Sequence, residues 1–147
     1  MQATEGGADG VVLLDVLAGE GDFDRSILER LGHLIVECSG PDVNKLCPLV
    51  GGQGCPKFEE AHGIVFELDL DRPQHRDIVE RYAELGRPDL PIRVVVHPDQ
   101  QARYASLLSK VQVWDHSPTV ADLDGFAAQV EAADRMETPR SVRQPEG

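Results

Sequence analysis

The stretch Gly63-Ile-Val-Phe-Glu-Leu-Asp-Leu-Asp-Arg-Pro73 decides the fold that we predict for this chain. It begins as an apolar run and then changes abruptly to acidic residues and proline. An apolar run between polar turn residues is typical of a strand that is buried on both faces of a sheet. The carboxylates of Asp69 and Asp71 should then lie at the carboxyl end of this strand, where open α/β sheets hold their ligands.

The chain on either side repeats one plan, in which an amphipathic helix follows an apolar strand. Besides the central strand, we predict strands at 11–15, 33–38, 91–96 and 111–115. We predict helices at 23–31, 73–85, 99–108 and 119–130, with a short helical turn at 56–61. This alternation predicts an α/β fold with right-handed crossovers, a three-layer α/β/α sandwich around a five-stranded parallel sheet.

The length of 147 residues predicts one domain, which we place at 11–135. Residues 1–10 are polar and rich in glycine, and residues 136–147 show no apolar periodicity, so we expect a disordered lead-in and a disordered tail. The segment 39–56 contains two cysteines, Pro48 and the pair Gly51-Gly52, which predicts a structured loop.

The composition excludes two classes of partner. With 14 basic and 26 acidic residues, the net charge of −12 opposes the phosphate backbone of nucleic acids. No apolar run approaches the roughly 18 residues of a membrane span. The acidic N-terminus does not have the pattern of a signal peptide, and we expect a cytoplasmic protein.

Over residues 11–135 the order of elements resembles the receiver domain of two-component response regulators. In that family a phosphate-accepting aspartate ends the third strand and a proline follows four residues later, as Asp69 and Pro73 do here. The resemblance implies a flavodoxin-like sheet with the strand order 2-1-3-4-5. It also implies an acidic cluster of Asp15, Asp69 and Asp71, with Mg²⁺ bound at Asp15 and Asp69.

The chain departs from the receiver pattern at three places. Val16 replaces the second residue of the acidic pair that ends the first strand. Val96 stands where the family has Ser or Thr, and Ser117 stands before Pro118 where the family has Lys. The resemblance therefore implies a degenerate receiver, or pseudo-receiver, in which the fold is kept and phosphotransfer is lost.

The two central carboxylates also have plainer interpretations. A strand-end acid such as Asp69 commonly accepts hydrogen bonds from backbone amides, and Asp71 is placed to cap the helix that begins near Pro73. The glycines at 51–54 do not form a phosphate-binding loop, because no strand leads directly into them and no Lys follows. We find no recognisable nucleophile or catalytic acid-base pair, and expect no enzyme activity.

Three cysteines, Cys38, Cys47 and Cys55, leave several alternatives open. Their spacing is not that of a CxxC metal site, so they are incidental thiols, a reversible Cys47–Cys55 disulfide, or ligands of zinc or an iron–sulfur cluster. His62 would complete a tetrahedral zinc site with them. Thiol, metal and sulfide analysis of protein purified without oxygen would distinguish these alternatives.

Two histidines that follow strands, His97 and His116, could form a metal site with Asp69. More commonly such histidines form hydrogen bonds to the loop backbone, and that is the plainer interpretation.

The function that we predict is a small regulatory protein that signals by binding a protein partner or a second copy of itself. The predicted interface is formed by the last helix, the fifth strand and the preceding helix, with Trp114 as its anchor. The alternative is a redox or metal sensor that uses the three cysteines.

Overall fold

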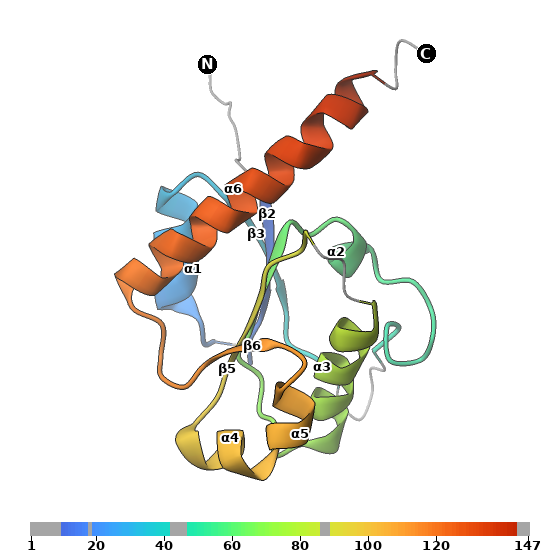
Figure 1. Ribbon diagram of the computed structural model, residues 1–147, viewed down its shortest axis with the longest axis vertical. Helices are drawn as coiled ribbons and strands as arrows, with labels where there is room; N and C mark the ends of the chain where they lie inside the picture. The colour runs from blue at the N-terminus through green and yellow to red at the C-terminus, as the bar shows by residue number, and fades with distance from the viewer. Residues whose placement is uncertain (1–9, 18, 42–46, 86–88, 144–147) are drawn as a thin grey trace.

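The computed structural model describes residues 10–17, 19–41, 47–85 and 89–143, with side chains described as far as Met136. Its centre is a five-stranded parallel sheet with helices on both faces (Figure 1). The strands are β2 (Val11–Asp15), β3 (Leu34–Cys38), β4 (Gly63–Phe66), β5 (Ile92–Val95) and β6 (Gln112–Trp114). Their spatial order, β3-β2-β4-β5-β6, is 2-1-3-4-5 in chain order, which confirms the predicted flavodoxin-like topology.

The helices lie in two layers on either side of the sheet. One layer contains α1 (Asp22–Arg30) and the long α6 (Val120–Arg143). The other contains α2 (Pro56–Glu59), α3 (Pro73–Leu85) and α5 (Ala105–Leu108), and the short α4 (Pro98–Arg103) leads into α5. Among the described residues, no helix combines the length and the apolar character that crossing a bilayer requires.

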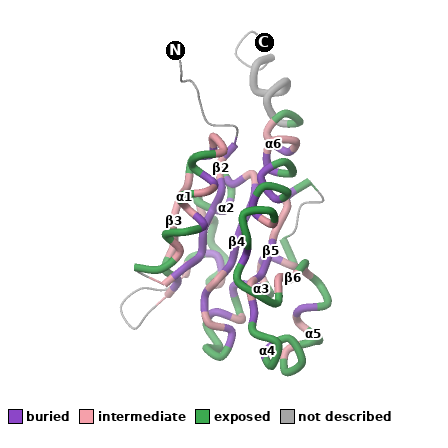
Figure 2. Tube along the Cα trace, turned by 90° about the vertical axis from the view of Figure 1, so that its left-hand side faces the viewer, coloured by how far each residue is buried: buried purple, intermediate pink, exposed green. Residues whose placement is uncertain are grey.

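The central strand β4 is buried along its whole length, as the apolar run predicts (Figure 2). Successive side chains of a strand point to opposite faces of the sheet. Ile64 and Phe66 therefore join the core beneath α3, and Val65 joins the core beneath α1 and α6. All three side chains are fully buried, and the edge strand β3 is less buried than β4.

The quoted stretch leaves the sheet earlier than the sequence predicts. β4 ends at Phe66, so Asp69 and Asp71 lie in the turn that leads to α3 and not at the strand end. The Asp69 carbonyl accepts a hydrogen bond from the Arg72 amide (3.0 Å), which closes this turn. Leu68 and Leu70 continue the apolar alternation in sequence, but they are buried within the turn, in the core beneath α3.

Two helices also differ from the prediction. α6 continues to Arg143, whereas we expected a disordered tail from Met136. Backbone hydrogen bonds can extend a helix where apolar periodicity is absent. α1 begins and ends one residue before the predicted helix at 23–31, and its N-cap is Gly21 in a left-handed conformation. Residues 1–9 and 144–147 lie outside the described residues.

Gly63→Ala should destabilise the fold, and Gly125→Ala is the matched control. A Cβ at Gly63 would lie 2.5 Å from Val130 Cγ2 and 3.0 Å from Phe126 Cζ, both in the buried contact with α6. Overpacking of this kind costs about 1–3 kcal/mol. A Cβ at Gly125 meets nothing within 4 Å, so the same change on the exposed side of α6 should stabilise the helix by up to about 1 kcal/mol.

Urea unfolding of both variants measures the two free energies. Equal stabilities for Gly63→Ala and the unmodified protein would contradict the close approach of α6 to β4.

Candidate functional site

A pocket of about 510 Å³ lies where the loops after β2, β4, β5 and β6 meet, and we call it the carboxyl-edge pocket. Five carboxylates line it: Glu20, Glu67, Asp69, Asp71 and Asp115. Its other polar lining residues are His97, Gln100, His116 and Ser117. Among the described lining residues there is no Lys or Arg, so the pocket is strongly acidic.

The predicted phosphate acceptor, Asp69, lines this pocket but is engaged in the turn before α3. Its Oδ1 accepts hydrogen bonds from the Asp71 amide (2.9 Å) and from Gln100 Nε2 (3.4 Å). These contacts are typical of an aspartate that stabilises a turn. The geometry agrees with the plainer interpretation of Asp69, and phosphorylation of this residue stays a prediction.

His75, a residue for which we predicted no role, supports the same turn from α3. Its Nδ1 lies 3.1 Å from both the backbone nitrogen and the carbonyl oxygen of Asp69. The ring is buried, which lowers the pKa of His75 and favours the neutral form. Gly40 leaves room for it, because a Cβ there would lie 3.3 Å from His75 Nε2.

Asp71 is exposed, and its described side-chain bonds join the turn to α4 instead of capping α3. The Tyr104 hydroxyl donates a hydrogen bond to Asp71 Oδ1 (2.8 Å), and Arg103 forms an ion pair with the same oxygen. The Tyr104 bond is the main cause that lowers the pKa of Asp71, and Gln100 and Arg103 act in the same direction. The predicted helix cap was therefore wrong.

Glu67 is the carboxylate that directly follows β4, and we did not predict it as a site residue. Its amide donates to the Asp15 carbonyl (2.7 Å), which continues the sheet pairing by one residue. Its Oε2 is buried and has no hydrogen-bond partner among the described residues. An acidic residue immediately after the apolar Gly63–Phe66 run could have indicated the strand end. We instead read Glu67 as an interior position of a longer strand.

Asp15 is not among the described residues that line the carboxyl-edge pocket, whereas Asp69 and Asp71 are. Alternation along β2 places Leu13 and Asp15 on the side of α3. Asp15 is 2% exposed and accepts a hydrogen bond from the Tyr82 hydroxyl (2.6 Å). Burial raises the pKa of Asp15 to about 7, although the Tyr82 bond and the positive charge of Lys57 lower it in part.

The three cysteines are thiols in the structure, and they pack against the core beneath α3. Cys38 and Cys47 lie near Tyr82, and in their thiolate form they would add to the effects of burial and Asp15 that raise the pKa of the Tyr82 hydroxyl. Part of the predicted loop, 42–46, lies outside the described residues. Redox and metal chemistry at these thiols stays a prediction.

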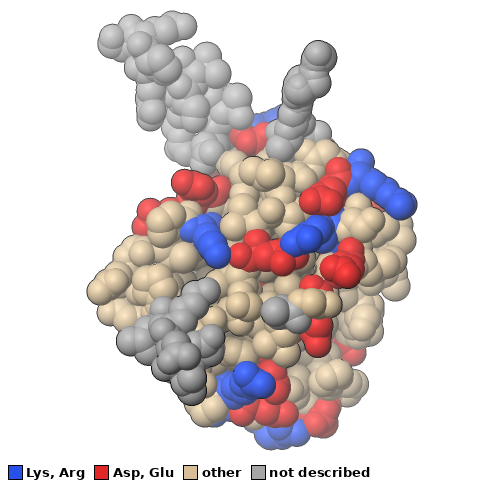
Figure 3. Space-filling view, turned by 180° about the vertical axis from the view of Figure 1, so that it is seen from behind, with Lys and Arg blue, Asp and Glu red and all other residues tan. Residues whose placement is uncertain are grey.

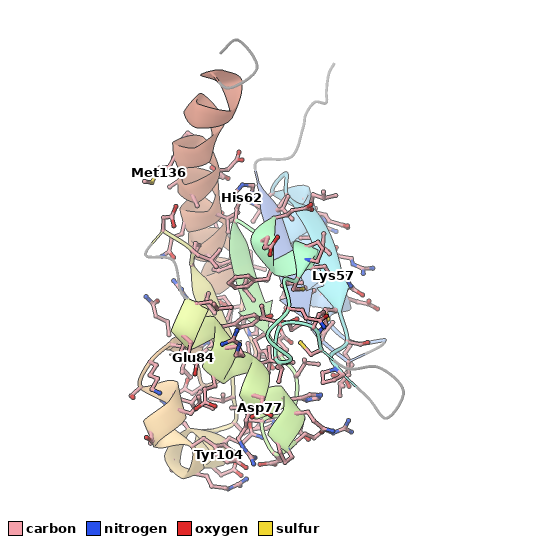
Figure 4. The ribbon with its side chains drawn as sticks, turned by 90° about the vertical axis from the view of Figure 1, so that its right-hand side faces the viewer. Lys57, His62, Asp77, Glu84, Tyr104 and Met136 are labelled. Carbon is pink, nitrogen blue, oxygen red and sulfur yellow. The ribbon has the colours of Figure 1, made fainter. Side chains whose placement is uncertain are left out.

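His62 lies at the opposite edge of the sheet from Cys38. Its Nδ1 accepts a hydrogen bond from the Val11 amide (3.0 Å), and its Nε2 lies 3.6 Å from Asp134 Oδ1 on α6 (Figure 4). The structure therefore does not bring His62 to Cys38. Within the described part of the chain, no group of three or more His, Cys, Asp or Glu side chains is arranged to hold a metal ion.

His97 and His116 both line the carboxyl-edge pocket, but only His97 makes contacts with the backbone at a helix start, and the His116 ring contacts two carboxylates. His97 is the N-cap of α4 and forms a capping box with Gln100. His116 contacts Asp115 (3.0 Å) and Asp122 (2.8 Å), and these hydrogen bonds raise the pKa of His116.

Trp114, the predicted interface anchor, is half-buried on the α6 side of the edge strand β6. Its ring meets that of Phe126 edge-on, with centroids 6.0 Å apart. The Arg93 guanidinium carbon lies 5.9 Å from the centroid of the Trp114 ring. Part of this side chain therefore belongs to the core of the domain.

The fold is that of a receiver domain, as comparison with solved structures shows. NtrX from Brucella abortus, in its complex with ATP, matches 89% of this chain with a TM-score of 0.56 and 12% sequence identity. This chain covers only 28% of that NtrX chain. A response regulator receiver domain protein from Clostridium thermocellum matches over 87% of this chain and 95% of its own, with a TM-score of 0.56 and 11% identity. No family model and no curated protein matches the sequence.

Asp15→Asn should remove a pH dependence of stability. Burial raises the pKa of Asp15 from 3.8 to about 7, so between these values the folded protein holds a proton that the unfolded chain has released. The free energy of unfolding should therefore fall as the pH rises from about 4 to about 7, by on the order of a few kcal/mol, and then level off. The Asn variant should lack this decline and gain relative stability at about pH 8.

Urea unfolding of both proteins across this pH range gives the comparison. Burial also raises the pKa of Asp24 to about 6. Asp24 is present in both proteins, so its contribution to the pH dependence cancels in the comparison. Tyr82→Phe is a further control, because loss of the hydrogen bond that lowers the pKa of Asp15 should extend the decline to higher pH. Parallel pH profiles for Asp15→Asn and the unmodified protein would show that this carboxyl is ionised in the fold.

Proposed function

We propose that this chain is a regulatory protein with a receiver-like fold that acts by binding a protein partner or a second copy of itself. In this proposal it is not an enzyme, and it signals without accepting a phosphoryl group. The cytoplasm, where we expect it to work, would keep its three cysteines as thiols. No Mg²⁺, zinc or iron–sulfur cluster is needed for this role.

The loss of phosphotransfer is supported mainly by the charge of the carboxyl-edge pocket. A phosphoryl group adds about 1.5–2 negative charges at neutral pH, and it is usually held by Lys, Arg or a metal ion. Here it would join five carboxylates in a pocket whose described lining has no Lys or Arg. Val96 and Ser117 line the same pocket at the positions where the receiver resemblance implies a hydroxyl and a Lys.

Two surface features support action through protein contacts. The described part of α6 has a large exposed apolar side chain at each end. These are Val120, which is 54% exposed, and Met136, which is 63% exposed. The adjoining strand β6 forms an edge of the sheet, with Trp114 half-buried beside α6. On the face shown in Figure 3, basic and acidic side chains are interspersed and form no basic patch, which supports a protein rather than a nucleic acid as partner.

Acetyl phosphate with Mg²⁺ should leave the protein unphosphorylated, because the carboxyl-edge pocket repels a further anion. Mass spectrometry of the intact protein gives the readout, and a phosphorylation-competent receiver domain in the same tube is the positive control. A phosphoryl adduct that disappears in Asp69→Asn would overturn the proposed loss of phosphotransfer. An adduct that disappears only in Glu67→Gln would overturn it equally and would move the acceptor to the strand end.

Val120→Asp should weaken self-association or partner binding, because it places a charge on the proposed interface. The dissociation constant should rise about tenfold, as it does for a moderately important interface residue. Phe23→Asp is the matched control, since Phe23 is similarly exposed (52%) but lies on α1. Trp114→Ala should have the same effect as Val120→Asp, with the sheet still folded by circular dichroism.

Sedimentation velocity measures self-association, and cross-linking to a purified partner measures a heterologous complex. If Val120→Asp, Trp114→Ala and Phe23→Asp all associate as the unmodified protein does, the proposed interface is wrong.

A further inference from the structure

A second pocket, of about 600 Å³, lies at the amino ends of β5 and β6, at the opposite edge of the sheet from the acidic site. We call it the amino-edge pocket. Its lining includes Arg93 from β5, Lys110 and Gln112 near the start of β6, and Gln129 from α6. None of these side chains has a role in the proposed function.

Arg93 is an unusual residue for its position. It occupies a strand of the core, and only 9% of its surface is exposed. Its Nη1 donates a hydrogen bond to the Ile92 carbonyl (3.1 Å), and its Nη2 donates one to Gln129 Oε1 (2.9 Å). The guanidinium carbon lies 5.6 Å from the centroid of the Phe126 ring and 5.9 Å from that of the Trp114 ring.

The Arg93 charge has no ionic partner among the described residues. Burial lowers the pKa of Arg93, and in the described part of the chain no carboxylate opposes this effect. The aromatic rings and Gln129 offset only part of the cost of burying a cation, which amounts to several kcal/mol. A guanidinium also carries five N–H donors, and the described bonds use two of them.

Lys110 adds a second cation to the same pocket. It is exposed, and within the described residues it forms no ion pair. Asp89 is the single carboxylate among the described lining residues, and it is not paired with Arg93. The described lining of this pocket therefore carries two cations and one carboxylate in a chain of net charge −12.

We propose that the amino-edge pocket binds a small oxyanion, a carboxylate or a phosphate group, between the Arg93 guanidinium and the Lys110 ammonium group. Arg93 supplies a planar fork that matches two oxygens of such an anion. Gln129 holds one arm of this fork through its bond to Nη2 and so fixes its orientation. Lys110 acts as a flexible point charge at the mouth of the pocket.

Trp114 is the only tryptophan of the chain and lies beside the Arg93 guanidinium, so it reports on the site directly. We would titrate the full chain with sodium phosphate and with sodium malonate, and follow Trp114 emission and the thermal midpoint. Sodium chloride at matched ionic strength is the control for screening. A saturable change with either anion, accompanied by a higher midpoint, is the expected result.

The two anions distinguish the sources of the ligand. A response to phosphate alone would assign a phosphate-bearing ligand, and a response to malonate alone would assign a carboxylate ligand. Either result supports the oxyanion site.

Lys110→Gln should weaken the affinity about fivefold, as the loss of one exposed charge contact of about 1 kcal/mol predicts. Lys57→Gln is the matched control, because Lys57 is also exposed but lies on α2, where it donates to the Glu37 carbonyl. Arg93→Lys keeps the charge but removes the fork, and it should weaken binding further.

Three results would overturn the proposal. They are the absence of a saturable response to both anions, an equal response to chloride, and an equal loss of affinity in Lys110→Gln and Lys57→Gln. Because Lys110 is exposed, its variant remains informative even if substitutions at the buried Arg93 prevent folding.

Discussion

The burial of β4 on both faces is the constraint on which the rest of the structure depends. A strand in this position must present apolar side chains in both directions, and Ile64, Val65 and Phe66 do so without any exposed surface. Residues in register on neighbouring parallel strands point to the same face of the sheet, and Phe66 is in register with Asp15. Asp15 therefore faces the core beneath α3, where only the Tyr82 hydroxyl is described as its hydrogen-bond donor.

The two pockets at the opposite edges of the sheet differ in charge. The amino termini of α3, α4 and α6 lie near the carboxyl ends of the strands, and helix amino termini favour negative side chains. Asp122 illustrates this effect, because its Oδ2 accepts the Thr119 amide (3.0 Å) while its own amide donates to Thr119 Oγ1 (3.1 Å). Many acids at this edge thus have a structural reason to be there. At the amino edge, Lys110 follows the end of α5 by two residues, and helix carboxyl termini favour cations, whereas Arg93 lies within β5 and has no such reason.

The sequence was sufficient for the topology but not for the site. Apolar runs and their spacing predicted all five strands and the bounds of α3, because burial and periodicity are local in sequence. The end of β4 was placed too late because Leu68 and Leu70 mimic strand alternation while packing in a turn. Contacts between distant elements determine three features of the structure: the burial of His75, the Asp15–Tyr82 hydrogen bond and the surroundings of Arg93. No local pattern contains that information.

Asp15 and Arg93 show how two buried ionisable groups can have different consequences in one sheet. A carboxyl group can relieve the cost of burial by keeping its proton, and the raised pKa of Asp15 shows this response. An arginine cannot do the same, because its guanidinium stays protonated throughout the range in which proteins are folded. The positive charge of a buried guanidinium must therefore be stabilised by aromatic rings, by polar groups or by a bound anion. The first two are visible around Arg93, and the open pocket beside it is where the third would enter.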